Sequence, residues 1–142
     1  MADVFTRAKR SEVMRRIRSK DTTPERILRK GLHRLGLRYR LHATHLPGRP
    51  DLVFRKYRAV VNVRGCFWHR HTCSDGHLPK ARPHYWVPKL QATQARDRRN
   101  DTALRKLGWK VIVVWECRLR NRSMLQIQLR RIHRLLTGRS AS

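Results

Sequence analysis

The feature that most constrains this chain is a nine-residue run, GCFWHRHTC at 65–73, which holds two cysteines and two histidines. Cys66, His71 and Cys73 are close enough in sequence to share one metal ion, and Cys117, directly after an apolar run, supplies a fourth ligand. Three cysteines and one histidine form a closed tetrahedral zinc set of the structural type. Small buried thiols would account for one cysteine, but not for three together with a histidine. The sequence therefore predicts a structural zinc ion.

The charge of the chain indicates its partner. The 142 residues contain 35 Lys and Arg against 9 Asp and Glu, a formal net charge of +26. Basic side chains that neutralise phosphates release counterions and bind strongly, so nucleic acid is the expected partner and a membrane surface a weaker candidate. No apolar run approaches the ~20 residues that span a bilayer. Charged residues at 1–15 also leave no signal-peptide core, so we expect a cytoplasmic protein.

The hydrophobic pattern predicts a single α/β domain over 1–142 with a mixed sheet flanked by helices. Residues 1–20 are expected to form an arm, and 137–142 a frayed tail. The run at 109–116 is continuously apolar, which is typical of a strand covered on both faces. The expected helices are 11–19, 22–36, 89–107 and 125–136, the expected strands are 37–42, 51–54, 59–63 and 109–116, and 77–88 is an expected loop.

One histidine of the nine-residue run is not needed by the predicted zinc site. Because an imidazole exchanges a proton near neutral pH, His69 is a candidate general base. The alternatives are that His69 replaces His71 as the zinc ligand, or that it only binds phosphate.

A second set of polar residues lies at the ends of two neighbouring predicted strands. Asp51 follows a proline at the head of one strand, and Asn62, Val63 and Arg64 end the next. This arrangement resembles the PD...(D/E)xK pattern of metal-dependent nucleases, in which Mg²⁺ binds carboxylate and carbonyl oxygens. Asn62 and Arg64 would point to the same face and could replace the (D/E)xK half. The alternative is that Asp51 is a turn residue after LPGRP.

Aromatic side chains stand among basic residues in two segments that we expect to be loops. Phe67 and Trp68 are adjacent, and Trp86 follows in the loop at 77–88 with Tyr85. Such rings can wedge between base pairs and kink a duplex. A small aromatic core that covers the zinc loop is the alternative. Trp109 and Trp115, at the predicted strand, are expected in the core.

Five blocks, in order and at their separations, resemble the very-short-patch-repair (Vsr) DNA mismatch endonucleases. The similarity runs from MADV at the start to about Leu119. It implies a restriction-endonuclease-like fold and Mg²⁺-dependent nicking of one DNA strand 5′ to the thymine of a T:G mismatch. It also implies a bacterial, nucleoid-associated protein whose nick is followed by mismatch-repair or replication proteins. The blocks are LPGRPD (46–51), GCFWHRHTC (65–73), Tyr85-Trp86, RDRRND (96–101) and LGWKVIVVWEC (107–117).

The resemblance also implies roles for single residues. Asp51 and the Val63 carbonyl would hold Mg²⁺, and His69 would act on the attacking water. Glu25 and Asp97 would support the active site, with Asp97 orienting His69. The zinc ligands would be Cys66, His71, Cys73 and Cys117. The DNA contacts would come from Phe67, Trp68 and Trp86 in the major groove and from an N-terminal segment with Met14, Arg15, Ile17 and Arg18 in the minor groove.

The chain departs from the family at one place, because Val63-Arg64 stands where relatives usually carry Thr-His. A backbone carbonyl ligand survives this change, but a second histidine is lost. Arg64 cannot exchange a proton near pH 7, although it can stabilise the charge of a phosphoryl transition state. Two alternatives to the T:G nickase therefore stay open: a related nuclease with another target, and a zinc-stabilised DNA-binding protein without cleavage. A monomer is expected, since a T:G site lacks two-fold symmetry.

Overall fold

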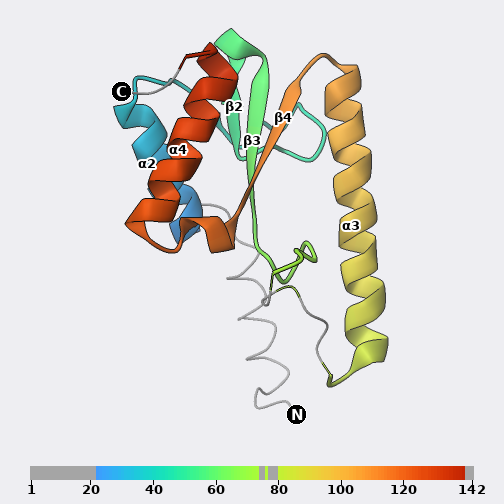
Figure 1. Ribbon diagram of the computed structural model, residues 1–142. Coiled ribbons are helices and arrows are strands. Elements are labelled where there is room, and N and C mark those ends of the chain that lie inside the picture. The colour runs from blue at the N-terminus through green and yellow to red at the C-terminus, as the bar shows by residue number, and fades with distance from the viewer. Residues whose placement is uncertain (1–21, 74–75, 77–79, 140–142) are drawn as a thin grey trace.

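The computed structural model describes residues 22–73, 76 and 80–139, which form a four-stranded sheet with helices on both faces (Figure 1). Strand β1 pairs antiparallel with β2, β2 pairs antiparallel with β3, and β3 pairs parallel with β4. The predicted α/β class with a mixed sheet is therefore confirmed. The strands are β1 (Arg40–Leu41), β2 (Leu52–Phe54), β3 (Ala59–Arg64) and β4 (Lys110–Trp115). The helices are α2 (Thr23–Arg34), α3 (Pro83–Lys106) and α4 (Arg122–Thr137), with short 3-10 turns η1 (Arg55–Tyr57) and η3 (Glu116–Leu119).

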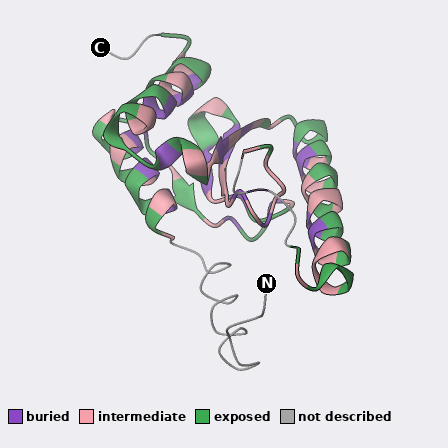
Figure 2. Cartoon of the chain, turned by 60° about the horizontal axis from the view of Figure 1, so that its bottom comes forward, coloured by how far each residue is buried: buried purple, intermediate pink, exposed green. Residues whose placement is uncertain are grey.

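The sheet is packed on both faces because successive strand residues point to opposite sides. On one face Phe54 and Val61 join Leu28 of α2 and Ile132 of α4 in the larger apolar cluster. On the other face Val53 and Val60 pack against Leu104 of α3. Buried and exposed residues mix along each helix, as one-sided packing requires (Figure 2). The molecule thus has three layers, with α2 and α4 on one side of the sheet and α3 on the other (Figure 1).

Helix ends follow the sequence in part. Gly36 and Gly108 follow the C-cap residues of α2 and α3 and adopt φ values of +87° and +90°. Only glycine reaches this region without steric cost. Helix α2 ends at Arg34 and α3 at Lys106, two residues and one residue before the ends expected at 36 and 107. Thr22 occupies the N-cap position of α2, but its side chain makes no capping hydrogen bond there.

The third helix was predicted to start too late. It begins at Pro83, so Tyr85 and Trp86 lie on α3 and not in a loop. The prediction placed 77–88 in a loop and began the helix at 89. Proline lacks the N–H for a helical hydrogen bond and is disfavoured inside a helix. In the structure Pro88 lies inside α3, and the turn before it is packed through the ring of Trp86 on Phe67 and Trp68. A local sequence pattern cannot predict these contacts, because they join residues far apart in the chain.

Two strand predictions were wrong in detail. The expected strand at 37–42 shrinks to Arg40–Leu41, since its partner β2 has only three residues. The run at 109–116 is not covered equally on both faces: Ile112 and Val114 are buried, whereas their neighbours along β4 are half-buried or exposed. Trp109 and Trp115, expected in the core, are likewise half-buried.

Parts of the prediction fall on residues outside the described ranges. The helix expected at 11–19, with Met14, Arg15, Ile17 and Arg18, is one of them. The described chain ends at 139, two residues after α4, so only the start of the expected tail at 137–142 is covered. Among the described residues, no helix combines the length and apolar character needed to cross a membrane.

Candidate active site

A cleft of about 890 Å³ opens at the carboxyl ends of the parallel strands β3 and β4. Its walls come from the start of α2, the segment before β2, the residues after β3 and the middle of α3. Every acidic residue that the structure describes lines this cleft. In a chain of net charge +26, gathering the carboxylates in one place marks it as the candidate site for chemistry. The five are Glu25, Asp51, Asp97, Asp101 and Glu116.

Asp51 is fixed at the junction of β2 and β3. Its Oδ2 accepts a hydrogen bond of 2.8 Å from the Val63 N–H, and its own N–H donates to Asn62 Oδ1 at 3.2 Å. Burial raises the pKa of Asp51 above its ordinary value, against the lowering effects of the Val63 bond and of the charges on His42, His69 and Arg64. Asp51 is therefore tied into the sheet ladder and is more than a turn residue.

His69 is oriented by a carboxylate of α3. Its Nδ1 lies 2.5 Å from Asp97 Oδ2, and its backbone N–H donates to the Gly65 carbonyl at 3.1 Å. Because Asp97 occupies Nδ1, proton exchange with any other group falls to Nε2. His69 and Asp97 line the same cleft as Asp51.

Arg64, the last residue of β3, is paired with a residue that the sequence analysis did not single out. Arg64 Nη2 donates to both carboxylate oxygens of Asp101, at 2.8 and 2.9 Å. Asp101 lies on α3, one helical turn after Asp97. The block RDRRND contains both aspartates at this spacing, which was the available signal.

A second missed residue, His42, lies between two carboxylates. Its Nε2 is 3.1 Å from Glu25 Oε1, and its Nδ1 is 3.9 Å from Asp51 Oδ1. The ligand atoms of Glu25, His42 and Asp51 all lie within 4.8 Å of one another, as in a metal site. The register gives the reason: Leu41 pairs with Leu52, so the next residues, His42 and Asp51, face each other. Glu25 reaches the site from the first turn of α2.

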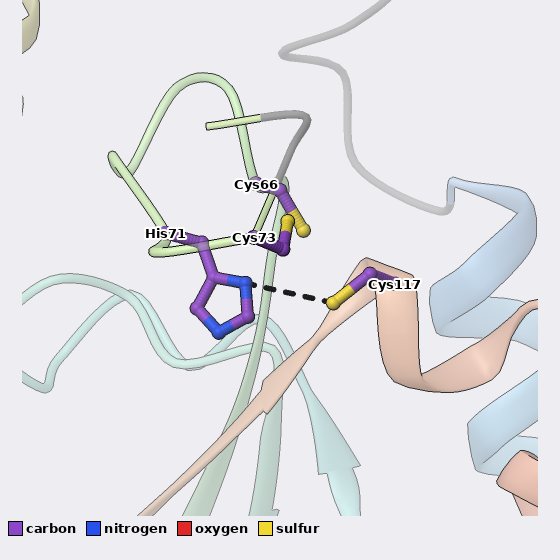
Figure 3. A group of neighbouring side chains, drawn as sticks. All are labelled: Cys66, His71, Cys73 and Cys117. Atoms are coloured by element: carbon purple, nitrogen blue, oxygen red, sulfur yellow. Dashed lines mark hydrogen bonds between the residues drawn. The ribbon is translucent and has the colours of Figure 1, made fainter. Parts of the chain in front are cut away.

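The predicted zinc ligands come together beside this cleft. One ligand atom from each of Cys66, His71, Cys73 and Cys117 lies within 4.8 Å of the others (Figure 3). The Cys117 Sγ lies 3.5 Å from His71 Nδ1. His71, and not His69, is the histidine of this group. Its ring stacks on Trp115, with centroids 4.2 Å apart.

Burial shifts the pKa of two members of this group, Cys66 and His71. It raises the pKa of the Cys66 thiol to about 12. Burial, aided by the Arg118 charge, lowers the pKa of His71, so its imidazole is neutral, which is the form that binds metals. The donor set fits a tetrahedral soft-metal site, because three sulfurs and one nitrogen are the ligands that zinc takes.

The aromatic side chains pack on one another. The Phe67 ring lies 5.2 Å from both Trp68 and Trp86, and Tyr85 lies 4.8 Å from Trp86, all edge to face. Trp68 is only 5% exposed, whereas Phe67 and Trp86 are half-buried. In the unbound protein these rings form the small aromatic core that was the alternative to a DNA wedge. A wedge would require Phe67 and Trp86 to leave it.

The chain is similar in sequence to known DNA-cleaving proteins. The family model for "DNA mismatch endonuclease Vsr" matches residues 2–75. The type II nicking enzyme V.XorIIP of Xanthomonas oryzae pv. oryzae is 48% identical over 132 residues, covering 93% of this chain and 97% of the relative. V.NmeAIP of Neisseria meningitidis serogroup A, also a type II nicking enzyme, is 46% identical over 134 residues (94% and 96%). The DNA mismatch endonuclease Vsr of Escherichia coli K12 is 42% identical over 144 residues (100% and 92%).

The burial of Asp51 predicts a trade-off between the site and stability. A carboxylate whose pKa is raised by folding binds its proton more readily in the folded state, so its contribution to stability falls as the pH rises past the ordinary carboxyl pKa of about 4. Asp51→Asn should therefore raise the thermal midpoint at pH 8 without added divalent cations, and raise it less at about pH 4. An equal change at both pH values, or a lower midpoint at pH 8, would contradict this account of Asp51.

Proposed function

The chain belongs to the DNA mismatch endonuclease Vsr family, and from this premise we propose that it nicks one strand of duplex DNA 5′ to the thymine of a T:G mismatch. The membership makes it a DNA-cleaving enzyme; the mismatch and the position of the cut are the proposal. The observation that carries it is the shared cleft, in which Asp51, the His69–Asp97 pair and Arg64 line one space. We also propose that the chain has the restriction-endonuclease-like fold that the resemblance implies.

The donors around Asp51 fit a hard cation. Asp51 and Glu25 supply carboxylate oxygens, and the carbonyl of Val63 shares a side of β3 with its N–H, which already bonds Asp51. Asp51 and Val63 would therefore hold Mg²⁺, with Glu25 and His42 close by. Bound Mg²⁺ supplies charge that neutralises the phosphate and makes a water more acidic.

The side chains of the chain then perform the remaining steps. His69 takes the proton of the attacking water at Nε2, while Asp97 on Nδ1 keeps the ring oriented and stabilises the imidazolium that forms. The water oxygen bonds to phosphorus, and the P–O3′ bond breaks. Solvent protonates the departing 3′ oxygen, which leaves a 3′-hydroxyl and a 5′-phosphate on the thymine. Arg64, aimed into the cleft, faces the extra negative charge of the transition state.

The Cys66, His71, Cys73 and Cys117 group is proposed to hold a structural Zn²⁺. Cys66 follows the end of β3 by two residues, and Cys117 follows the end of β4 by two. A bound ion would therefore tie the 65–73 loop to the neighbouring strand and hold His69 at a constant distance from Asp51. The loop carries Phe67 and Trp68 as well, so zinc would fix both the general base His69 and these two aromatic rings.

DNA recognition is proposed to use the aromatic cluster and the net charge. Phe67 and Trp86, the more exposed rings, would enter the duplex beside the mismatch, with Trp68 as their buried support. The N-terminal segment with Met14, Arg15, Ile17 and Arg18, outside the described residues, would contact the minor groove. We further propose a monomer of one domain that acts on DNA in the bacterial cytoplasm and precedes mismatch-repair or replication proteins.

A related nuclease with another target is the second candidate. Two relatives of 46–48% identity are named type II nicking enzymes, and Arg64 stands next to the proposed metal ligand Val63. A cleavage-deficient DNA-binding protein is disfavoured, because the relatives are named as nicking enzymes or an endonuclease and because Asp51, His69 and Asp97 line one cleft.

The nicking reaction is tested on a labelled panel of duplexes at moderate salt. We expect Mg²⁺-dependent cleavage of one strand of T:G and not of T:A. Asp51→Ala should lower the rate by more than ~10³-fold, since even one preorganised donor contributes ~10²–10³. DNA affinity should be retained in this variant. Cleavage of T:A or of another mismatch in preference to T:G would establish the second candidate, and no cleavage of any duplex would overturn both.

The two histidines of the loop provide a matched pair for the zinc site. His71→Gln should lose zinc, measured as metal bound per chain, and should lower the thermal midpoint, because a structural metal contributes folding free energy. His69→Gln should keep zinc and the midpoint but lose nicking, and Thr72→Ser, an exposed position between two ligands, should change none of these. Zinc retained in His71→Gln, or lost in His69→Gln, would refute the assignment.

A further inference from the structure

Arg64 and Asp101 form an ion pair inside the catalytic cleft. Both side chains are largely buried, with 12% and 13% exposed, and both line the cleft beside Asp51. Exchange of an arginine–aspartate pair for apolar residues is often neutral for folding, so such a pair is weak evidence of a stabilising role. Its place in the cleft indicates another role.

The pair repeats the arrangement that orients the general base. Asp97 and Asp101 are four residues apart on α3, so they lie one above the other on the same side of the helix. Asp97 bonds His69, and Asp101 bonds Arg64. Two successive turns of α3 thus each place a carboxylate against a basic side chain. Asp97 meets His69 from the loop after β3, and Asp101 meets Arg64 from the end of β3.

The geometry of the bond leaves donors of Arg64 available. Both hydrogen bonds between Arg64 and Asp101 come from the same nitrogen, Nη2. Guanidinium has five N–H donors in a rigid planar fork, so fixing one end fixes the direction of the others. Arg64 and the proposed metal ligand Asp51 line the same cleft. The charge of Arg64 is also among the influences that lower the pKa of Asp51 against the larger effect of burial.

We propose that Asp101 is a positioning residue, which holds the Arg64 guanidinium in the direction that its remaining N–H groups need to bond the scissile phosphate. This inference rests on the proposed function. A long arginine side chain would otherwise sample many rotamers, and its interaction with the developing charge would be weaker because it would have to reorganise during the reaction. Asp101 removes that cost before DNA binds.

Asp101 has an opposite effect on binding. Its carboxylate adds negative charge to a cleft that receives a polyanion, so it weakens the attraction of DNA while it orients Arg64. A substitution that removes the charge of Asp101 should therefore lower the nicking rate but leave DNA affinity unchanged or make it tighter. A merely structural role would lower both rate and affinity through loss of folded protein.

The test compares single-turnover nicking of the T:G duplex with its equilibrium affinity. Asp101→Asn should lower the rate roughly 10²-fold, the effect of a ~1 Å misplacement, with affinity unchanged or tighter. Arg64→Ala should lower the rate by ~10²–10³-fold. The double variant should be no slower than Arg64→Ala alone, because residues that act as a unit are not additive. Thr102→Lys, exposed on α3 outside the cleft, also adds one positive charge and should leave the rate unchanged.

Thermal midpoints are measured for every variant. Should Asp101→Asn fail to fold, Arg64→Lys carries the test, since lysine keeps the charge but lacks the fork, and its rate must fall with affinity preserved. A wild-type rate in the folded Asp101→Asn or in Arg64→Lys would overturn the proposal, as would a double variant that shows the product of both losses. If the wild-type chain nicks no duplex, the proposed function itself fails; if it nicks and Asp101→Asn nicks equally, only this inference fails.

Discussion

The site depends first on the hydrogen bond between the Val63 N–H and the Asp51 carboxylate. This bond continues the β2–β3 ladder by one side chain, so the strand register itself determines where the carboxylate lies. Burial makes the charged form of Asp51 costly, as its raised pKa indicates. A bound cation would remove that cost, which supports the metal site proposed at Asp51. The charges of His42, His69 and Arg64 lower the pKa of Asp51 and so offset part of the cost of its burial.

Each layer of the fold brings one part of the site to this carboxylate. Helix α2 contributes Glu25 from its first turn, and α3 contributes Asp97 and Asp101 from successive turns. The Cys/His group lies where β3 and β4 end, and in our account zinc holds the 65–73 loop there. Helix α3 also carries Trp86, which packs on the same loop. Trp86, one of the two rings proposed to meet DNA, thus belongs to the same helix as the carboxylates that bond His69 and Arg64.

Local signals in the sequence predicted most elements and much of the site. The hydrophobic pattern placed most helices and strands, and the clustered cysteines with His71 predicted the soft-ligand group, which the structure brings together. The failures have one physical cause. Trp86 joins α3 despite Pro88 because distant rings pack on it, and His42 and Asp101 reach the cleft only through strand register and helix packing. Contacts between segments far apart in the chain carry no local pattern. The choice between His69 and His71 as ligand was also open until the fold placed them.

In the proposed function, one cleft receives the scissile phosphate between Asp51, His69 and Arg64. The most direct measurement is a crystal structure of the His69→Ala variant with a T:G duplex and Mg²⁺. We expect the phosphate 5′ to the thymine to lie inside the cleft, with Mg²⁺ bound to Asp51. One oxygen of this phosphate should accept a hydrogen bond from a guanidinium N–H of Arg64 that Asp101 does not use. A scissile phosphate bound outside the cleft, or an Arg64 turned away from it, would contradict the account.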